Sequence, residues 1–155
     1  VYNRVKHLGP NTAGTGTTTI NNGNVNAGGD ISITTGAITF SGTGTINANA
    51  GAGAVTLTAL TGAITSGDAL TDITAATLVA TADTGIGTFG NPILTQVSQL
   101  FARNITSGDI IIVNTGGLEL IDLPGWGYAV SNPAGAVTIT ASSSPIAVTN
   151  NVIAG

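Results

Sequence analysis

Three aspartates and one arginine are the residues with which this chain could perform acid–base chemistry. Asp68 and Asp72 flank a short loop, Asp83 follows one segment later, and Arg103 is the one basic residue after the first seven positions. A β-helix that cleaves a sugar polymer needs two or three carboxylates, often with a basic residue, gathered on one face. Aspartate is also a common turn residue, because its side chain hydrogen-bonds the nearby backbone. We therefore favour solvated turn aspartates and expect that the protein is not an enzyme.

Asparagine and glycine cluster at residues 22–24 and 27–30, which raises the question of a calcium site. These segments resemble the glycine-rich nonapeptide turns that bind calcium between stacked coils. Such turns need an acid in every repeat, because Ca²⁺ takes several oxygen ligands. Here Asn22 and Asn24 replace the acids and the nine-residue period fails. We interpret these asparagines as residues that tolerate left-handed backbone or stack their amides, and we expect no metal ion or cofactor.

Charge is scarce throughout the chain. Only 6% of residues are charged, against about 25% in ordinary globular domains, and the net charge is −4. Three Lys and Arg residues are too few to follow a nucleic-acid backbone. No segment reaches the ~20 apolar residues of a membrane-spanning helix. The sequence has no cysteine, so disulfides and thiolate metal sites are excluded.

One six-residue pattern recurs at residues 29–34, 53–58, 108–113 and 135–140. Each copy has a glycine, a small or acidic residue, and then β-branched or leucine residues alternating with outward ones. This alternation is typical of a strand with one buried face. Counted after the glycine, the copies start at 30, 54, 109 and 136, so intervals of 24 and 27 flank a gap of 55. The gap is close to two repeats and predicts one degenerate coil, entered near residues 78–80 or 100–102.

A second short apolar strand is expected after a glycine turn in each repeat, at residues 37–40, 63–65, 118–120 and 145–148. A period of 20 to 30 residues with this content indicates a solenoid. We predict an all-β fold, a parallel β-helix of about five coils of roughly 24–27 residues, over residues 17–155. Residues 93–104 could instead form a short helix, but their alternation favours strand. The expected inward positions are Ile31, Ile33, Ile38, Phe40, Val55, Leu57, Ile64, Ile110, Ile112, Leu118, Leu120, Val137, Ile139, Ile146 and Val148.

Residues 1–16 do not match the repeat and are expected to be an N-terminal arm or cap. Tyr2, Arg4 and Lys6 alternate with apolar or amide residues there. The segment is either a frayed terminus or an arm that docks on an acidic neighbour through these three side chains. Because the chain opens on Val1 and contains no methionine, we expect a processed product or a segment of a longer chain.

The copy at residues 108–113 is an exception, because Ile111 and Val113 stand where the other copies have Ser, Thr or another polar residue. The inserted loop at 122–130 contains Trp126, the only tryptophan, and Tyr128. Together these residues could form an exposed apolar patch for a partner, or the aromatic rings could stack on a sugar. The alternative is that the loop folds back and covers the strand.

Outward Ser and Thr residues predict a possible Thr-x-Thr ladder of the kind that binds ice, although threonine is also a good exposed strand residue. Ile111 and Val113 would interrupt this ladder. Its members would be Ser32, Thr34, Thr56, Thr58, Thr138 and Thr140.

Residues 53–59 followed by 62–67, and residues 85–92 followed by 107–116, resemble the repeat region of large bacterial surface proteins. These are the filamentous-haemagglutinin-type adhesins and the giant β-strand-repeat proteins, and the resemblance covers roughly residues 31–155. It implies a right-handed parallel β-helix, export to the cell surface, and an adhesive or filament-forming stalk. It brings no catalytic residues. It also gives little weight to the glycosylation sequon that begins at Asn104.

A solenoid has two ends with unpaired strand edges, which need caps or further coils. We therefore expect a structural or adhesive module of an extracellular filament that stacks end to end, with copies of itself or with adjacent repeats of a longer chain. A ligand-binding or glycan-binding adhesin tip at the Trp126 loop is the alternative, followed by the ice-binding β-helix.

Overall fold

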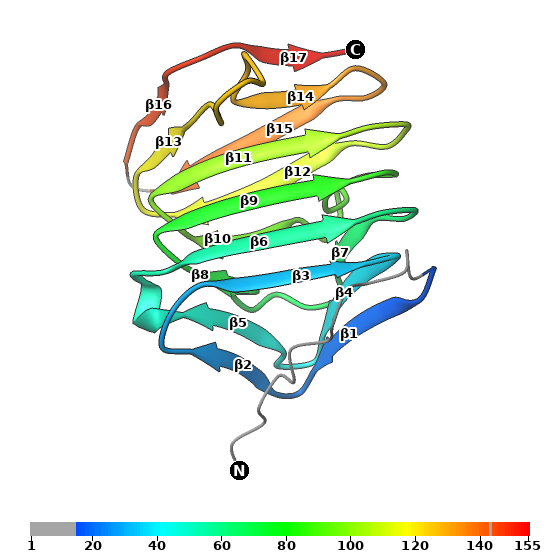
Figure 1. Cartoon of the computed structure of the whole chain (residues 1–155), viewed down its shortest axis with the longest axis vertical. Coiled ribbons are helices and arrows are strands. Elements are labelled where there is room, and N and C mark those ends of the chain that lie inside the picture. Colours follow the sequence, from blue (N-terminus) through cyan, green and yellow to red (C-terminus); the bar gives the residue numbers. More distant parts are fainter. Residues whose placement is uncertain (1–14, 143) are drawn as a thin grey trace.

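The computed structural model describes residues 15–142 and 144–155. This part of the chain is all-β, with 54% of residues in strands, and the strands stack as a parallel β-solenoid (Figure 1). The fold class predicted from the sequence is therefore confirmed. Tyr2, Arg4 and Lys6 lie outside the described residues, as does most of the expected arm at 1–16. No helix in the described part is long and apolar enough to cross a membrane.

The strands form three parallel sheets that run along the stack. The three-stranded sheet contains β1 (Thr17–Asn21), β4 (Ala37–Ser41) and β7 (Ile64–Ser66). The six-stranded sheet contains β2 (Asn24–Ala27), β5 (Thr45–Ala48), β8 (Ile73–Thr74), β10 (Ile93–Gln96), β12 (Ile110–Thr115) and β15 (Val137–Ser142). The eight-stranded sheet contains β3 (Ile31–Thr35), β6 (Ala54–Ala59), β9 (Thr77–Ala82), β11 (Gln99–Asn104), β13 (Leu118–Leu120), β14 (Val130–Asn132), β16 (Ile146–Val148) and β17 (Val152–Ala154). A short 3-10 turn, η1 (Asn49–Gly51), follows β5.

Six successive coils make up the solenoid, one more than the five predicted. Coil 1 is β1, β2 and β3, coil 2 is β4, β5 and β6, and coil 3 is β7, β8 and β9. In coil 4 a single bridge residue, Ile86, precedes β10 and β11. Coil 5 is β12, β13 and β14, and coil 6 is β15, β16 and β17, which lies at one end of the stack (Figure 1).

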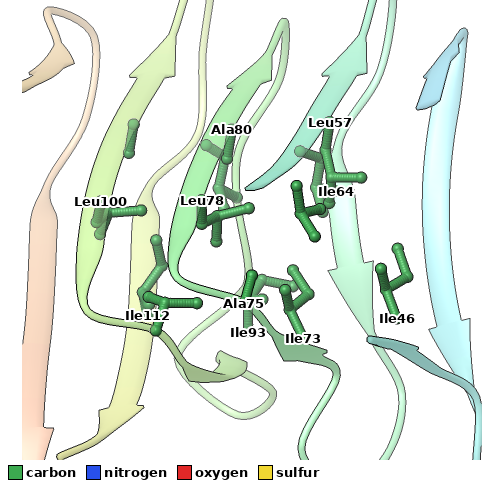
Figure 2. Close-up of a cluster of buried hydrophobic side chains, with 14 of the residues drawn as sticks. Ile46, Leu57, Ile64, Ile73, Ala75, Leu78, Ala80, Ile93, Leu100 and Ile112 are labelled. Carbon is green, nitrogen blue, oxygen red and sulfur yellow. The ribbon is translucent and has the colours of Figure 1, made fainter. Parts of the chain in front are cut away.

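Equivalent inward positions of successive coils stack directly above one another. In the eight-stranded sheet Val55, Leu78, Leu100 and Leu120 are successive register partners. Their side chains and those of the facing six-stranded sheet meet in one continuous cluster, which Figure 2 shows around Leu78. Burial of such a column removes apolar surface from water at every rung, so each coil stabilises its neighbours.

The four copies of the six-residue pattern do not occupy equivalent positions in their coils, so the repeat predicted from the sequence is corrected. The copies at 29–34 and 53–58 contain β3 and β6 of the eight-stranded sheet, whereas those at 108–113 and 135–140 begin β12 and β15 of the six-stranded sheet. The gap between them therefore contains two coils, whose eight-stranded-sheet rungs are β9 and β11, and not one. Register spacings run from 19 residues (Ile93 to Ile112) to 28 (Leu118 to Ile146), a wider range than 24–27.

The strand assignments at 93–104 and the four predicted second strands are confirmed. Fourteen of the fifteen expected inward residues belong to the hydrophobic core or pack against it. Val148 is the exception and is 58% exposed. It is the register partner of Leu120, so its exposure arises from the position of coil 6 and not from a register error.

Candidate functional site

An aromatic cluster lies on the outer surface of the eight-stranded sheet. Along β11, Leu100 and Ala102 belong to the core, so the alternating residues Phe101 and Arg103 face outward. Phe101 is nevertheless only 1% exposed. The loop at 121–129, between β13 and β14, folds back over this strand and covers the phenylalanine with Trp126 and Tyr128.

The three rings pack at favourable aromatic geometries. The Phe101 centroid lies 5.7 Å from that of Trp126 at 63° and 5.7 Å from that of Tyr128 at 22°. Trp126 and Tyr128 are 5.8 Å apart at 75°. The Arg103 guanidinium carbon lies 4.7 Å from the Trp126 ring centroid, which is within cation–π range. We call these four residues the aromatic platform.

The local chain makes the platform possible. Gly125 and Gly127, on either side of Trp126, have φ values of 90° and 73°, a backbone region that residues other than glycine rarely adopt. The end of the loop is held by coil 6, because the Ala129 N–H donates to the Asn151 carbonyl at 2.9 Å. Trp126 is thus fixed in place and still 42% exposed.

Arg103 carries the one basic charge among the described residues, and it has no ionic partner there. Within the described part of the chain its guanidinium makes neither an ion pair nor a hydrogen bond, and it packs on the Trp126 ring. The register partners of Arg103 are Thr81 on β9, which is half-buried, and Ser131 on β14, which is buried. The site therefore combines an exposed indole, an uncompensated cation and one neighbouring threonine hydroxyl.

The single apolar patch expected from Ile111, Val113, Trp126 and Tyr128 does not form. Trp126 and Tyr128 do come together, but Ile111 and Val113 lie on β12 in the six-stranded sheet. Ile111 is only 7% exposed, so it is not an exposed contact. The chain at Gly87 passes beside it so closely that a side chain there would overlap the Ile111 carbonyl group.

Phe101 was not expected at any site from the sequence, and Arg103 was considered only for catalysis and not beside Trp126. A signal for them exists, because the inward alternation of Leu100, Ala102 and Asn104 places both residues on the outer surface. An outward phenylalanine in a strand needs a cover, and the inserted loop containing the only tryptophan is the available one. The loop does fold back over a strand, as the alternative interpretation held, but over β11 and not over β12.

Asp68 and Asp72 form a second polar cluster, where the chain runs from β7 to β8. Asp72 is completely buried, so the expectation of a solvated turn aspartate is wrong for this residue. Its carboxylate accepts hydrogen bonds from the Ser66 hydroxyl at 3.0 Å and the Leu94 N–H at 2.8 Å. Burial raises the pKa of Asp72 from 3.8 to about 6, the two hydrogen bonds oppose this rise, and the Asp68 charge adds to it.

The residues considered for catalysis are engaged in three different places. Asp68 accepts the Leu70 N–H at 2.8 Å, close to Asp72. Asp83 is hydrogen-bonded to the Thr106 hydroxyl beside the eight-stranded sheet, and Arg103 stacks on the aromatic platform. No group of three or more His, Cys, Asp or Glu residues in the described part is arranged to hold a metal ion.

Asn22 takes one of the two roles expected for it and Asn24, whereas an amide ladder forms at other asparagines. Asn22 has a φ of 49°, in the left-handed region. The amide group of Asn104 donates to the Asn132 side-chain oxygen at 3.1 Å, which forms a buried amide ladder between coils 4 and 5. Asn104 is 1% exposed, and its nitrogen also donates to the Ser107 and Gly108 carbonyls. The sequon at Asn104 is therefore inaccessible in the folded chain.

The expected Thr-x-Thr ladder is divided between two sheets. Ser32 pairs with Thr56, and Thr34 with Thr58, in the eight-stranded sheet. Thr138 and Thr140 lie on β15 in the six-stranded sheet. Because these hydroxyl groups lie on different sheets, the single flat ice-binding face predicted from the sequence is not formed.

The outer end of coil 6 is the third notable surface. Leu78, Leu100 and Leu120 are at most 4% exposed, but their continuation in the same column, Val148, is 58% exposed. Val152 on β17 is also 43% exposed. In the described residues β15, β16 and β17 each pair with a strand of coil 5 on one side only. The end therefore presents unpaired strand edges together with the apolar side chains that a further coil would cover.

Comparison of the chain with protein-family models, with curated proteins and with solved structures gives no match.

Proposed function

We propose that this chain is a structural β-solenoid module of an extracellular bacterial filament or surface adhesin, of the filamentous-haemagglutinin type that its repeats resemble. In this proposal coil 6 receives the first coil of a second copy, and the copies form a homo-oligomeric filament. Adjacent repeats of a longer chain would use the same edge. The observation that supports the proposal best is the inward column of the eight-stranded sheet, which is buried through coil 5 and opens at Val148.

The geometry of stacking favours an open filament. In the described part, coil 1 offers β1, β2 and β3 as edges that pair on one side only, and coil 6 offers β15, β16 and β17. Joining one end to the other is a head-to-tail contact, which does not close on itself unless the subunits curve into a ring. The inward apolar residues of coil 6 would then become part of a continuous core.

Electron microscopy and fibre diffraction of the 155-residue chain test the proposal. Stacked parallel coils repeat at about 4.8 Å, so six coils predict an axial subunit repeat of about 29 Å. We expect filaments with both spacings. Discrete particles of single copies at every concentration would overturn the filament proposal.

A second candidate function is that of an adhesin tip that binds a ligand at the loop containing Trp126. The observation in its favour is that Trp126 is held against Phe101 and Arg103 and still exposes 42% of its surface. Replacing Trp126 by Ala should then abolish receptor or glycan binding and leave assembly through coil 6 intact. An unchanged affinity in this variant would remove the candidate.

A further inference from the structure

The exposed part of the aromatic platform is suited to a small ring. Trp126 keeps 42% of its surface accessible, while Phe101 beneath it is buried and Tyr128 stands at 75° to the indole. The rings of Trp126 and Tyr128 thus form an angled aromatic surface against the sheet. Aromatic side chains with one accessible surface and a fixed position lose little conformational entropy when a ligand stacks on them.

Arg103 favours a ligand that carries a negative charge. Its guanidinium rests on Trp126 and makes no ion pair or hydrogen bond within the described residues, so its donors remain available. A guanidinium binds a carboxylate through two parallel hydrogen bonds, and an adjacent ring orients it for that contact. Because the guanidinium lies over one face of the Trp126 ring, a ligand stacks on the other face, and its carboxylate reaches Arg103 around the edge of the indole.

The surroundings favour a saccharide over a protein partner. Thr81, a half-buried register partner of Arg103, offers a hydroxyl group there, whereas the other partner, Ser131, is buried. A stable protein interface buries about 800 Å² on each partner around an apolar core. On β9 the outward neighbours of the platform are Val79, the register partner of Phe101, and Thr81, which do not form a large apolar surface. The large apolar side chains of Leu60 and Phe89 are exposed elsewhere on the chain. The platform fits one or two sugar rings better than a protein surface.

We propose that the aromatic platform binds a carboxylate-bearing pyranose, the uronic acid unit of an acidic polysaccharide. The ring of the sugar stacks on Trp126 beside Tyr128, its carboxylate pairs with Arg103, and a hydroxyl group faces Thr81. This inference rests on the second function proposed above, ligand binding at the Trp126 loop, and it specifies the class of ligand.

The test uses the fluorescence of Trp126, the only tryptophan in the chain. The probes are oligomers of galacturonic, glucuronic and mannuronic acid, each compared with its methyl ester, which keeps the ring and removes the charge. We expect a saturable change in emission with at least one acid, and an affinity about tenfold or more lower for its ester. The affinity for the acid should also fall as salt is added.

Three variants separate the contributions. Arg103→Gln should lower the affinity for the acid by about tenfold and bring it close to that of the ester. Arg103→Lys keeps the charge and loses the planar fork, so its affinity should lie between the two. Phe89→Ala is the matched aromatic control, because Phe89 is 95% exposed on a different turn and should have no effect. Circular dichroism of each variant verifies its fold.

The outcomes distinguish this inference from the function on which it rests. Equal binding of acid and ester, lost in a calorimetric titration of Trp126→Ala, would leave ligand binding in place and overturn the acidic specificity. No binding of any saccharide or of an acidic peptide would overturn both. An emission change with an acidic peptide and with none of the saccharides would identify a protein partner and also overturn the inference.

Discussion

The Arg103 guanidinium carbon lies 4.7 Å from the ring centroid of Trp126, and the two residues belong to different coils. Arg103 is on β11 of coil 4, whereas Trp126 is in the loop that joins β13 to β14 of coil 5. A strand of one coil and a loop of the next coil are thus held together outside the hydrophobic core. The Phe101 side chain on this strand packs under the loop.

Replacing Phe101 by Ala should destabilise the protein and release the loop. Phe101 is 1% exposed and contacts both Trp126 and Tyr128, so its removal leaves a cavity under the loop. We expect the free energy of unfolding to fall by about 3 kcal/mol. The emission of Trp126 should shift to the red as the indole becomes more hydrated.

Phe89→Ala provides the control for this experiment. Phe89 is 95% exposed, and its removal should change the free energy of unfolding by no more than about 0.5 kcal/mol. Equal losses in the two variants in urea unfolding would contradict the role assigned to Phe101.

Asp72 should make the protein less stable at neutral pH than at mildly acidic pH. Its pKa is about 6 in the folded chain and about 3.8 when exposed, so between these values the folded state holds a proton that the unfolded state releases. The free energy of unfolding therefore falls as the pH rises from about 4 to about 6, and the loss persists above pH 6. Two pKa units correspond to about 3 kcal/mol.

Urea unfolding at pH 4.5 and 7.5 measures this effect as the difference between the wild type and Asp72→Asn. The wild type should lose stability relative to the variant as the pH rises. Asp83→Asn, which leaves Asp72 in place, should retain the dependence. A difference that stays constant, or that increases with pH, would show that burial does not control the titration of Asp72.

Removing the Asn104 amide group, or replacing it by a carboxylate, should destabilise the protein. Its side chain accepts the Gly85 N–H and donates to the Ser107 carbonyl, the Gly108 carbonyl and the Asn132 side chain. Asn104→Ala leaves these buried groups unpaired, and we expect a loss of about 2 kcal/mol or more. Asn104→Asp has nearly the same shape but turns the donor into an anion that faces carbonyl groups, so it should be at least as damaging.

The exposed Asn26 on β2 is the matched control for the amide ladder. Asn26→Ala should unfold at nearly the same temperature as the wild type. If thermal unfolding of Asn104→Ala also matched the wild type, the ladder would contribute nothing to stability.

Alternation and glycine turns were sufficient to predict many of the strands and their inward residues, but not strands such as β2 and β5. Ile31, Val55 and Ile110 face the core as their spacing predicts. The sheet that a strand joins is decided by the lengths of the turns before it, because the local pattern is the same in β3 and β12. The register spacing between coils varies from 19 to 28 residues, so equal patterns came to lie on different sheets and one coil was missed.

The candidate site was predictable only in part. Trp126 and Tyr128 were expected together, whereas Phe101 and Arg103 required knowledge of which strand the loop would cover. Burial of Asp72 was also beyond the sequence, because an aspartate beside a glycine turn normally remains solvated. The first case is a loop that folds back on the outer surface of a sheet, and the second is a carboxylate hydrogen-bonded to the buried Ser66 and to the next coil at Leu94; a strand pattern encodes neither contact.

The most direct test of the account is sedimentation velocity of the chain with and without charges on the outer end of coil 6. Val148→Lys with Val152→Lys places two cations on this end, where both valines are already exposed. Leu60→Lys with Leu70→Lys adds the same charge at exposed leucines elsewhere. We expect concentration-dependent association of the wild type and of the leucine variant, and a monomer for the valine variant. A wild type that remains monomeric, or a valine variant that associates as the wild type does, would contradict stacking through coil 6.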